Sequence, residues 1–417
     1  MLCATLKASS LLSILDANTC ADLIEFRLDH FSDLSTLAYL RSRCTRPVIF
    51  TTQKITSKLL ALKPDYIDLP STSSKKEFES IPPTIKRICS FHDFEKTPTD
   101  LDALYQKMRI LPAEFYKIAT TANSTIDALR LLAFVRKTKV IGVAMGKKGE
   151  ISRILAPMMG SPWTYAPISS HHKTAPGQLL LKELKGIYHT HLLSSKSKLF
   201  GLIGDPISTS ISHRTHNQLF EKLNIDAVYV KMAIKKHELD QFFPLAKQLQ
   251  FQGLSVTMPL KEAVIPHSNA PINTLSLVDK PIGINTDGIG ALDSLEQKTL
   301  VKNKQIAIIG AGGAAKAIAL EAKRRGAFIA FYNRTPKKGT QPLENLKHAT
   351  YDILINTSPH PIEIIPLAKS TVMDIVVSPA KTALLLAAEK RGCMLIEGME
   401  MFIKQAVAQF MWWFYET

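Results

Sequence analysis

The chain has 417 residues, of which 46% are hydrophobic and 21% are charged, a composition typical of a soluble globular protein. Lysine and arginine outnumber aspartate and glutamate by 52 to 36, giving a net charge of +16, but these residues are dispersed, which argues against a dedicated nucleic-acid-binding segment. No apolar run reaches the length of a membrane helix, and the first residues lack the pattern of a signal peptide.

The length of the chain and its cysteine content also indicate how many domains to expect and the redox state of its compartment. A chain of this length is too long for one ordinary core, so we expect two or three domains. The 5 cysteines are scattered without metal-ligand spacing, and the 12 histidines form no zinc signature, so we expect no metal ion. Buried free thiols in a reducing cytoplasm are the expected state of the cysteines. The positive charge predicts a solvated surface that steers anionic small molecules.

The first half of the chain alternates short β-favouring apolar runs with helix-compatible stretches such as Thr99–Ile110 and Ser124–Lys137. This rhythm is what an α/β protein with a (β/α)₈ barrel requires. In such barrels the active site lies at the carboxyl ends of the strands, and the polar candidate residues fall at or just after these ends. The apolar runs are residues 2–6, 23–28, 47–52, 65–69, 85–91, 115–120, 139–145 and 163–167.

The short polar segment Leu192–Lys198 is predicted to be a linker, because it combines small and charged residues. The strand pattern restarts at Leu199–Gly204, and a second interruption lies near residues 298–304. We therefore predict three domains. They are a barrel over residues 1–193, a second lobe over 199–295, and a nucleotide-binding lobe over 296–417 whose C-terminal helix returns to the second lobe.

Two lysines lie in apolar, strand-like runs. Lys117 lies within Phe115–Thr120, and Lys261 closes the run Gly253–Lys261. An ammonium group is costly to remove from water, so burial is expected to lower the pKa of each lysine and to make it useful as a nucleophile or proton carrier. Each lysine has candidate partners in its own half of the chain, which suggests two fused enzymes.

Charged residues alternate in the run Glu25–Asp29. Period-two spacing places Glu25, Arg27 and Asp29 on one face of a strand. In a barrel this face would form a polar pocket; the alternative is a solvent-facing edge strand. His92 follows the fifth apolar run, although a single loop histidine is more often structural than catalytic.

The first half contains the runs Glu25–His30, His92–Phe94, Lys96–Pro98, Lys117–Ala119, Ile151–Arg153 and Ala175–Gln178. Together they resemble type I 3-dehydroquinate dehydratase, a (β/α)₈ enzyme. The resemblance covers most of residues 1–190. It implies that Lys117 forms a Schiff base with a substrate ketone. The iminium withdraws electrons, so that a histidine of ordinary pKa, His92, removes the neighbouring proton and then delivers it to the departing hydroxyl.

The same resemblance implies a set of substrate contacts. A guanidinium can engage both oxygens of a carboxylate, which suits Arg153. Two positions depart from the family pattern: Gln53 stands where an arginine is usual, and Pro70 where a glutamate that orients the histidine is usual. Asp68, two residues earlier on the same strand face, is the candidate replacement, and we predict a dehydratase of modest rate. The implied substrate-binding residues are Glu25, Arg27, Arg153, Thr174 and Gln178.

A glycine-rich turn in Ile308–Ala315 follows a predicted strand and precedes the helical run Ala314–Arg325. Such a turn lets the backbone approach a pyrophosphate at a helix N-terminus. After the next strand an acidic residue would indicate a free ribose 2′-hydroxyl, whereas Arg334 and Lys337 indicate a 2′-phosphate and hence NADP(H). The alternative is a solvated basic turn. The predicted cofactor residues are Gly310, Ala311, Gly312, Gly313, Ala314, Asn333, Arg334 and Thr335.

Residues 199–417 resemble shikimate dehydrogenase, through the runs Gly204–Ser212, Gly283–Gly288 and Gly398–Ala406 together with Lys261. The resemblance implies a substrate lobe and a Rossmann lobe. In the implied catalytic pair, Asp287 holds Lys261, which supplies or polarises the proton for the nascent alkoxide while NADPH gives hydride. The implied substrate-binding residues are Ser210, Ser212, Thr257, Asn273 and Gln405. The departures are His213, Ser255 and Val377, where proline, asparagine and tyrosine are usual.

The two resemblances together imply a bifunctional shikimate-pathway enzyme. It would convert 3-dehydroquinate to 3-dehydroshikimate and reduce this product to shikimate. We expect small-molecule partners only, without nucleic acid or membrane, and a monomer or weak dimer. One alternative is a shikimate or quinate dehydrogenase with a weakened N-terminal domain. Another is a basic nucleic-acid-binding protein, which would show salt-sensitive affinity.

Overall fold

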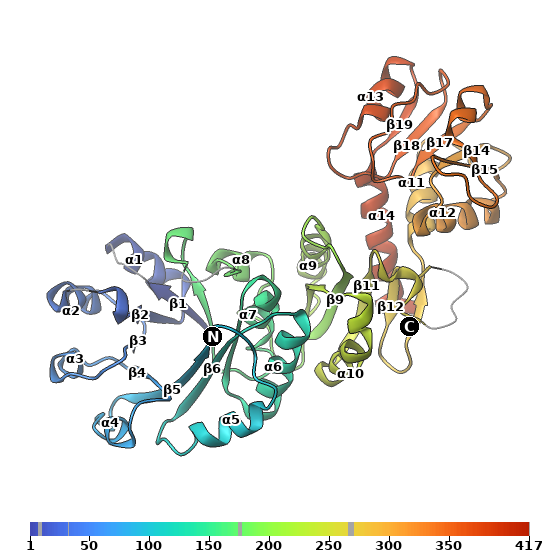
Figure 1. Cartoon of the computed structure of the whole chain (residues 1–417). Coiled ribbons are helices and arrows are strands. Elements are labelled where there is room, and N and C mark those ends of the chain that lie inside the picture. The colour runs from blue at the N-terminus through green and yellow to red at the C-terminus, as the bar shows by residue number, and fades with distance from the viewer. Residues whose placement is uncertain (7–10, 32, 174–176, 266–270, 417) are drawn as a thin grey trace. The chain divides into compact units, whose positions relative to one another are not determined.

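The computed structural model describes residues 1–6, 11–31, 33–173, 177–265 and 271–416, and Figure 1 labels its elements. The described chain divides into two compact units. Unit 1 comprises Met1–Gly201, Pro206–Thr209 and Asn217–Phe251, and unit 2 comprises Leu202–Asp205, Ser210–His216 and Gln252–Thr417. The domain limits expected from the sequence stay a prediction.

Strands and helices alternate along most of the chain. The strands are β1 Leu2–Leu6, β2 Leu23–Arg27, β3 Val48–Thr51, β4 Tyr66–Pro70, β5 Lys86–Asp93, β6 Phe115–Thr121, β7 Ile141–Met145, β8 Thr164–Pro167, β9 Lys198–Gly204, β10 Ala227–Ala233, β11 Phe251–Val256, β12 Thr274–Ser276, β13 Ile282–Ile284, β14 Gln305–Ile309, β15 Phe328–Asn333, β16 Gln341–Pro342, β17 Ile353–Asn356, β18 Thr371–Asp374 and β19 Met394–Ile396. The helices are α1 Leu11–Cys20, α2 Leu34–Ser42, α3 Ser57–Ala61, α4 Lys75–Glu79, α5 Leu101–Met108, α6 Thr125–Thr138, α7 Glu150–Leu155, α8 Leu181–Gly186, α9 Ser212–Lys222, α10 Leu239–Leu249, α11 Asp287–Glu296, α12 Gly313–Arg324, α13 Ala383–Lys390 and α14 Gly398–Met411.

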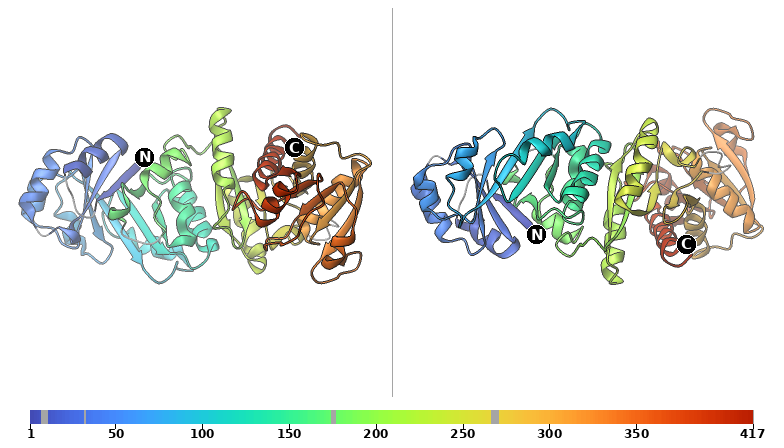
Figure 2. Two further views of the ribbon diagram at one scale, coloured as in Figure 1. Left: turned by 90° about the horizontal axis from the view of Figure 1, so that it is seen from above. Right: turned by 90° about the horizontal axis from the view of Figure 1, so that it is seen from below.

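The first eight strands form a nearly closed parallel barrel, which confirms the predicted fold. Their hydrogen-bonded order is β7-β6-β5-β4-β3-β2-β1-β8, so that β7 and β8 are its two ends. Helices α1 to α6 lie outside the strands in Figure 1, and the views of Figure 2 show the same layering. Buried inward side chains, among them Cys3, Ile88 and Trp163, fill the barrel beneath its polar residues.

Local sequence explains where the helices begin and end, as α6 illustrates. The hydroxyl of Ser124 accepts from the backbone N–H of Asp127 at 3.2 Å, and the Asp127 carboxylate accepts from the N–H of Ser124 at 3.0 Å. This reciprocal capping box starts the helix, and Lys139 ends it in the left-handed conformation. The helix expected over Ser124–Lys137 is confirmed.

Two further sheets follow the barrel. The first has the strand order β10-β9-β11-β12-β13, in which β12 pairs antiparallel with both β11 and β13. The second is parallel, with the order β16-β15-β14-β17-β18-β19. This is the strand order of a Rossmann fold, which binds its ligand in the crevice where the order reverses, between β14 and β17.

The C-terminal helix α14 packs closely against α11. A Cβ atom at Gly290 on α11 would lie 2.7 Å from the backbone nitrogen of Gln405, so only glycine permits this approach. Beyond α14, Trp413 donates from Nε1 to the carbonyl of Leu275 on β12 at 2.9 Å. The C-terminal segment is thereby attached to the strands that carry the polar residues of unit 2.

All 5 cysteines are free thiols. Cys3 and Cys89 are buried as expected, whereas Cys20, Cys44 and Cys393 are partly exposed. Within the described ranges, no helix has both the length and the apolar character needed to span a membrane.

Candidate active sites

Lys117 on β6 is buried in the barrel, with only 5% of the residue exposed. Its Nζ donates to Asp68 Oδ2 at 2.9 Å and to Glu25 Oε1 at 3.5 Å. The ring centroid of Tyr165 lies 4.4 Å from the same nitrogen, a distance at which an aromatic face attracts a cation. The ammonium is therefore held by two carboxylates and one aromatic ring.

Hydroxyl groups from neighbouring strands fix both carboxylates. Glu25 accepts from the hydroxyls of Thr5 at 2.9 Å and Thr51 at 2.8 Å. Asp68, which is 0% exposed, accepts from the hydroxyl of Ser90. Sequence reasoning missed these three hydroxyl residues. Their one signal is a hydroxyl residue placed directly after a buried apolar residue within a strand.

The expectation that burial lowers the pKa of Lys117 is wrong. Burial does oppose the charged form, but the negative charges of Asp68 and Glu25 together outweigh it and raise the pKa of Lys117. For Glu25, burial would raise the pKa, but the charge of Lys117 and the threonine hydrogen bonds lower it overall. The resting site therefore holds an ammonium ion between two carboxylates.

His92 lies on β5, one strand away from Lys117. Ser90 is the register partner of Lys117 and His92 that of Ala119, so His92 points to the same side of the sheet as Ser90. Burial, assisted by the positive charge of Lys117, lowers the pKa of His92 to about 4. The expectation of an ordinary pKa is thus wrong. At neutral pH the imidazole is uncharged and able to accept a proton.

The buried guanidinium of Arg153 on α7 lies in the same barrel. It is 3% exposed and donates from Nη1 to the carbonyl of Tyr165 at 2.9 Å. Burial lowers the pKa of Arg153 to about 10. This cation is suited to an anionic ligand, because its desolvation is only partly compensated within the protein.

The remaining predicted residues of the barrel differ in placement. Gln178 is buried, whereas Arg27 is partly exposed and forms an ion pair with Asp29 at 2.9 Å. The prediction that Asp29 shares a strand face with Glu25 is wrong, because β2 ends at Arg27 and a 3₁₀ turn follows. Thr174 lies outside the described residues.

In unit 2 the structure brings seven predicted residues together around one cavity of about 240 Å³. They come from segments far apart in the sequence, including the loop before α9, the end of β11, the start of α11 and the middle of α14. The seven residues are Ser210, Ser212, Thr257, Lys261, Asn273, Asp287 and Gln405.

Lys261 and Asp287 form the charged pair of this cavity, with Lys261 Nζ donating to Asp287 Oδ2. Asn273 donates to the other oxygen, Oδ1 of Asp287, at 2.8 Å, and its own Oδ1 accepts from the backbone N–H of Thr286 at 2.8 Å. Asp287 is thus oriented from two sides, and Lys261 is its ion-pair partner.

Gln409, which sequence reasoning missed, also lines this cavity. It lies one helical turn beyond Gln405, and residues spaced by four share a helix face. Its Oε1 accepts from the hydroxyl of Ser255 at 2.7 Å and lies 3.2 Å from Nε2 of His216, while its Nε2 donates to the carbonyl of Asn273 at 3.2 Å. Ser255, which stands where the family usually has asparagine, therefore has a hydrogen-bond partner. Val377, which stands where tyrosine is usual, also lines the cavity.

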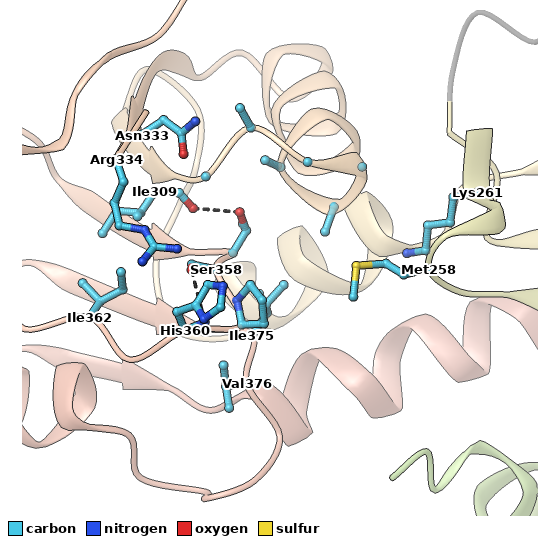
Figure 3. Close-up of a pocket in the computed structure, with 18 of the residues that line it drawn as sticks. Met258, Lys261, Ile309, Asn333, Arg334, Ser358, His360, Ile362, Ile375 and Val376 are labelled. Carbon is cyan, nitrogen blue, oxygen red and sulfur yellow. Dashed lines mark hydrogen bonds between the residues drawn. The ribbon is translucent and has the colours of Figure 1, made fainter. Parts of the chain in front are cut away.

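A second cavity of unit 2, of about 720 Å³, lies at the carboxyl ends of β14, β15 and β17. Figure 3 shows Asn333 and Arg334 at one end of it and Met258 and Lys261 at the other. The predicted cofactor residues that line it are Gly310, Ala311, Gly312, Gly313, Ala314, Asn333 and Arg334. The predicted Thr335 is absent from this lining; its carbonyl accepts from the Asn333 side chain at 2.8 Å.

These residues fit a dinucleotide. Gly310 has a φ of +109°, and a Cβ atom there would lie 2.4 Å from the hydroxyl oxygen of Thr357, so the close turn requires glycine. The N-terminus of α12, whose unpaired N–H groups attract phosphate, begins at Gly313. Arg334 and Lys337 add positive charge to the lining.

Comparison with known proteins identifies the families that the two parts of the chain match. Residues 2–194 match the family model of type I 3-dehydroquinase, and residues 202–276 match that of the shikimate dehydrogenase substrate binding domain. The shikimate biosynthesis protein AroDE of Chlamydia pneumoniae is 37% identical over 99% of this chain and 95% of its own length. The chain belongs to this bifunctional family.

Two other relatives support the assignment. The chloroplastic bifunctional 3-dehydroquinate dehydratase/shikimate dehydrogenase of Arabidopsis thaliana is 30% identical over 94% of this chain and 77% of its own length. A crystal structure of a shikimate dehydrogenase in complex with NADP⁺ has 31% identity and a TM-score of 0.50, covering 54% of this chain and 92% of that one.

Within the shikimate dehydrogenase part, the two cavities adjoin at Lys261. Both are lined by Thr257, Lys261, Ala314 and Ile375. A dehydrogenase must bring substrate and nicotinamide into contact, and Lys261 lies where the two cavities adjoin.

The buried His216 generates a prediction on stability. Burial lowers the pKa of His216 to about 4, so the unfolded state binds a proton that the folded state excludes between about pH 6.5 and pH 4. The contribution of His216 to the free energy of unfolding is fully present above pH 6.5. It is lost as the pH drops through this window, and the loss is roughly 3 kcal/mol. In a Trp163→Phe background, the tryptophan fluorescence comes only from Trp412 and Trp413. Urea titrations followed by this fluorescence should show that His216→Gln removes most of the loss of stability at low pH.

The matched control for this prediction is His237→Gln, because His237 is exposed. This variant should keep the pH dependence of the parent protein. Equal pH dependence in the His216→Gln variant and its parent would contradict the assignment of the acid sensitivity to His216.

Proposed function

We propose that the barrel dehydrates 3-dehydroquinate through a Schiff base on Lys117, and that unit 2 reduces the resulting 3-dehydroshikimate to shikimate with NADPH. The observation that carries this proposal is the position of the Lys261–Asp287 pair at the junction of the two cavities, in a chain whose barrel buries Lys117 near His92. The shared intermediate explains why one chain carries both activities.

In the barrel, the amine of Lys117 attacks the substrate ketone and forms an iminium ion. The iminium withdraws electrons from the adjacent C–H bond, which lowers the barrier to proton removal. His92, neutral because its pKa lies near 4, accepts this proton and returns it to the departing hydroxyl. Arg153 binds the substrate carboxylate, and Glu25, Arg27, Thr174 and Gln178 bind the hydroxyl groups.

In unit 2, Lys261 protonates the ketone oxygen as it becomes an alkoxide, and Asp287 holds Lys261 in position. Bound NADPH supplies the hydride. The adjacent hydroxyls of Ser210 and Ser212, joined by a hydrogen bond of 3.0 Å, bind the substrate carboxylate. Thr257, Asn273 and Gln405 bind the ring hydroxyls. These interactions fix the ketone beside Lys261 and the nicotinamide.

Arg334 and Lys337 favour NADP(H) over NAD(H), because both line the cofactor cavity after β15, where the ribose 2′-position of a dinucleotide lies in a Rossmann fold. A dehydrogenase specific for NAD or quinate is therefore the less favoured alternative. A cytoplasmic location, a monomeric or weakly dimeric state and the absence of nucleic-acid or membrane partners stay predictions.

The Schiff base gives a direct test of the barrel. Borohydride added during turnover of 3-dehydroquinate should reduce the iminium and attach substrate mass to the peptide that contains Lys117, as read by mass spectrometry. The Lys117→Ala variant should lose both the adduct and dehydration. Lys137→Ala, at an exposed ion pair on α6, is the control that should retain both. Full dehydration by Lys117→Ala would exclude the Schiff-base mechanism.

Lys261 gives the corresponding test of unit 2. Removal of a general acid typically slows a reaction by roughly 10²–10⁴-fold, so Lys261→Ala should lower NADPH-dependent reduction by this factor while dehydration of 3-dehydroquinate continues. Lys304→Ala, at a surface ion pair with Asp352, should reduce at the parent rate. Loss of both activities in Lys261→Ala would contradict separate sites.

Cofactor choice is tested at Arg334. A hydrogen bond to a charged group contributes about 1.5–3 kcal/mol, so Arg334→Ala should raise the KM for NADPH by roughly 10–100-fold and leave that for NADH nearly unchanged. Arg324→Ala, on the exposed side of α12, should change neither value. An equal rise for both cofactors would mean that Arg334 does not contact the 2′-phosphate.

A further inference from the structure

The resting barrel contains a chemical obstacle to the reaction proposed for it. Lys117 attacks a ketone only as a neutral amine, yet its Nζ lies between two carboxylates that stabilise the ammonium. Some group must therefore take a proton from Lys117 when the substrate is in place. This question rests on the proposed Schiff-base function, and it concerns the step before the first covalent bond forms.

The geometry favours Asp68 over Glu25 as the acceptor of this proton. Asp68 Oδ2 is the nearer oxygen, at 2.9 Å from Nζ against 3.5 Å for Glu25 Oε1. Both oxygens of Glu25 already accept a threonine hydroxyl, at 2.9 and 2.8 Å, and such hydrogen bonds stabilise the anion and oppose its protonation. In Asp68 the Ser90 hydroxyl binds the opposite oxygen, Oδ1, so that Oδ2 faces Lys117.

We propose that Asp68 is the acid–base partner of Lys117, taking a proton from the ammonium before attack and returning it to the carbinolamine hydroxyl. The nitrogen–carbon bond then forms, and a second N–H proton passes from the nitrogen to the former ketone oxygen to give the carbinolamine. The carbon–oxygen bond breaks as its hydroxyl, protonated by Asp68, leaves as water. The balance closes without any further reactant, since ammonium and ketone become iminium and water. Asp68 ends as a carboxylate and is the counter-ion of the iminium.

The surroundings of Lys117 suit this exchange of one cation for another. The site carries a positive charge at the same nitrogen before and after the Schiff base forms. The Tyr165 ring, 4.4 Å from Nζ and 4% exposed, attracts either cation through its face. Its backbone carbonyl also accepts from Arg153. Strand β8 thereby supports both the nucleophile and the group that binds the substrate carboxylate.

The test uses Asp68→Asn in the full-length protein. Asparagine keeps the shape of the side chain and an acceptor for Ser90, but it has no basic oxygen and no charge. Dehydration should slow by roughly 10²–10⁴-fold, as for the loss of other acid–base groups. Carbamoylation of Lys117 by cyanate, in which only the neutral amine acts as the nucleophile, should become faster at pH 8 because the nearest counter-charge is gone. A purely structural role would not move these two rates in opposite directions.

The control variant is Asp65→Asn. Asp65 precedes the same strand, at its other end, and pairs with Arg41 at 3.2 Å, so both rates should stay at the parent value. Dehydration by Asp68→Asn at the parent rate, or slower carbamoylation of Lys117 in that variant, would overturn the proposal. Failure of the parent protein itself to trap substrate on Lys117 would instead overturn the proposed function, so the two failures are distinguishable.

A second variant covers the case in which the Asp68→Asn barrel does not fold, as detected by loss of the near-ultraviolet signal of the buried Trp163. Asp68→Glu keeps the carboxylate and its charge. The proposal expects this variant to trap substrate on Lys117 with borohydride and to turn over. A folded Asp68→Glu protein without any trapped adduct would overturn it.

Discussion

A buried ammonium needs a counter-charge, and the barrel site is organised by this constraint. Removing one partner of a buried ion pair typically costs about 3–5 kcal/mol, because the other charge is left uncompensated. The barrel meets the constraint by bringing Glu25, Asp68 and Lys117 from β2, β4 and β6 to one interior point. These residues are far apart in the sequence, so the closure of the sheet is what creates the nucleophile's environment.

The two lysines differ in exposure in a way that matches their chemistry. The side chain of Lys117 is 7% exposed, while that of Lys261 is 18% exposed. In the proposed mechanism Lys117 forms and breaks a covalent bond, and its proton passes to a neighbouring group. Lys261 would give up a proton in each turnover and recover one from solvent, so complete burial would slow its return. Where the two cavities adjoin, Lys261 has both Asp287 as its ion-pair partner and access to solvent.

The sequence was sufficient to predict the barrel and the Rossmann lobe, because periodicity and motifs are local. It did not predict which side chains meet. Asp68 and Lys117 are separated by 49 residues, and Ser255 and Gln409 by 154, so their contacts depend on strand register and helix packing. The pKa of Lys117 was misjudged for the same reason. Burial was inferred from apolar neighbours, whereas the compensating carboxylates belong to other strands.

The two buried cations of the barrel, Arg153 and Lys117, differ in their electrostatic surroundings. Burial lowers the pKa of Arg153 to about 10, which marks a cation short of negative charge. The carboxylates around Lys117 raise its pKa, which marks a cation with negative charge in excess. In the mechanism proposed above, the carboxylate of an anionic ketone would be attracted to Arg153 and repelled by the carboxylates near Lys117. Its uncharged carbonyl would then face Lys117, which is the orientation that this mechanism requires.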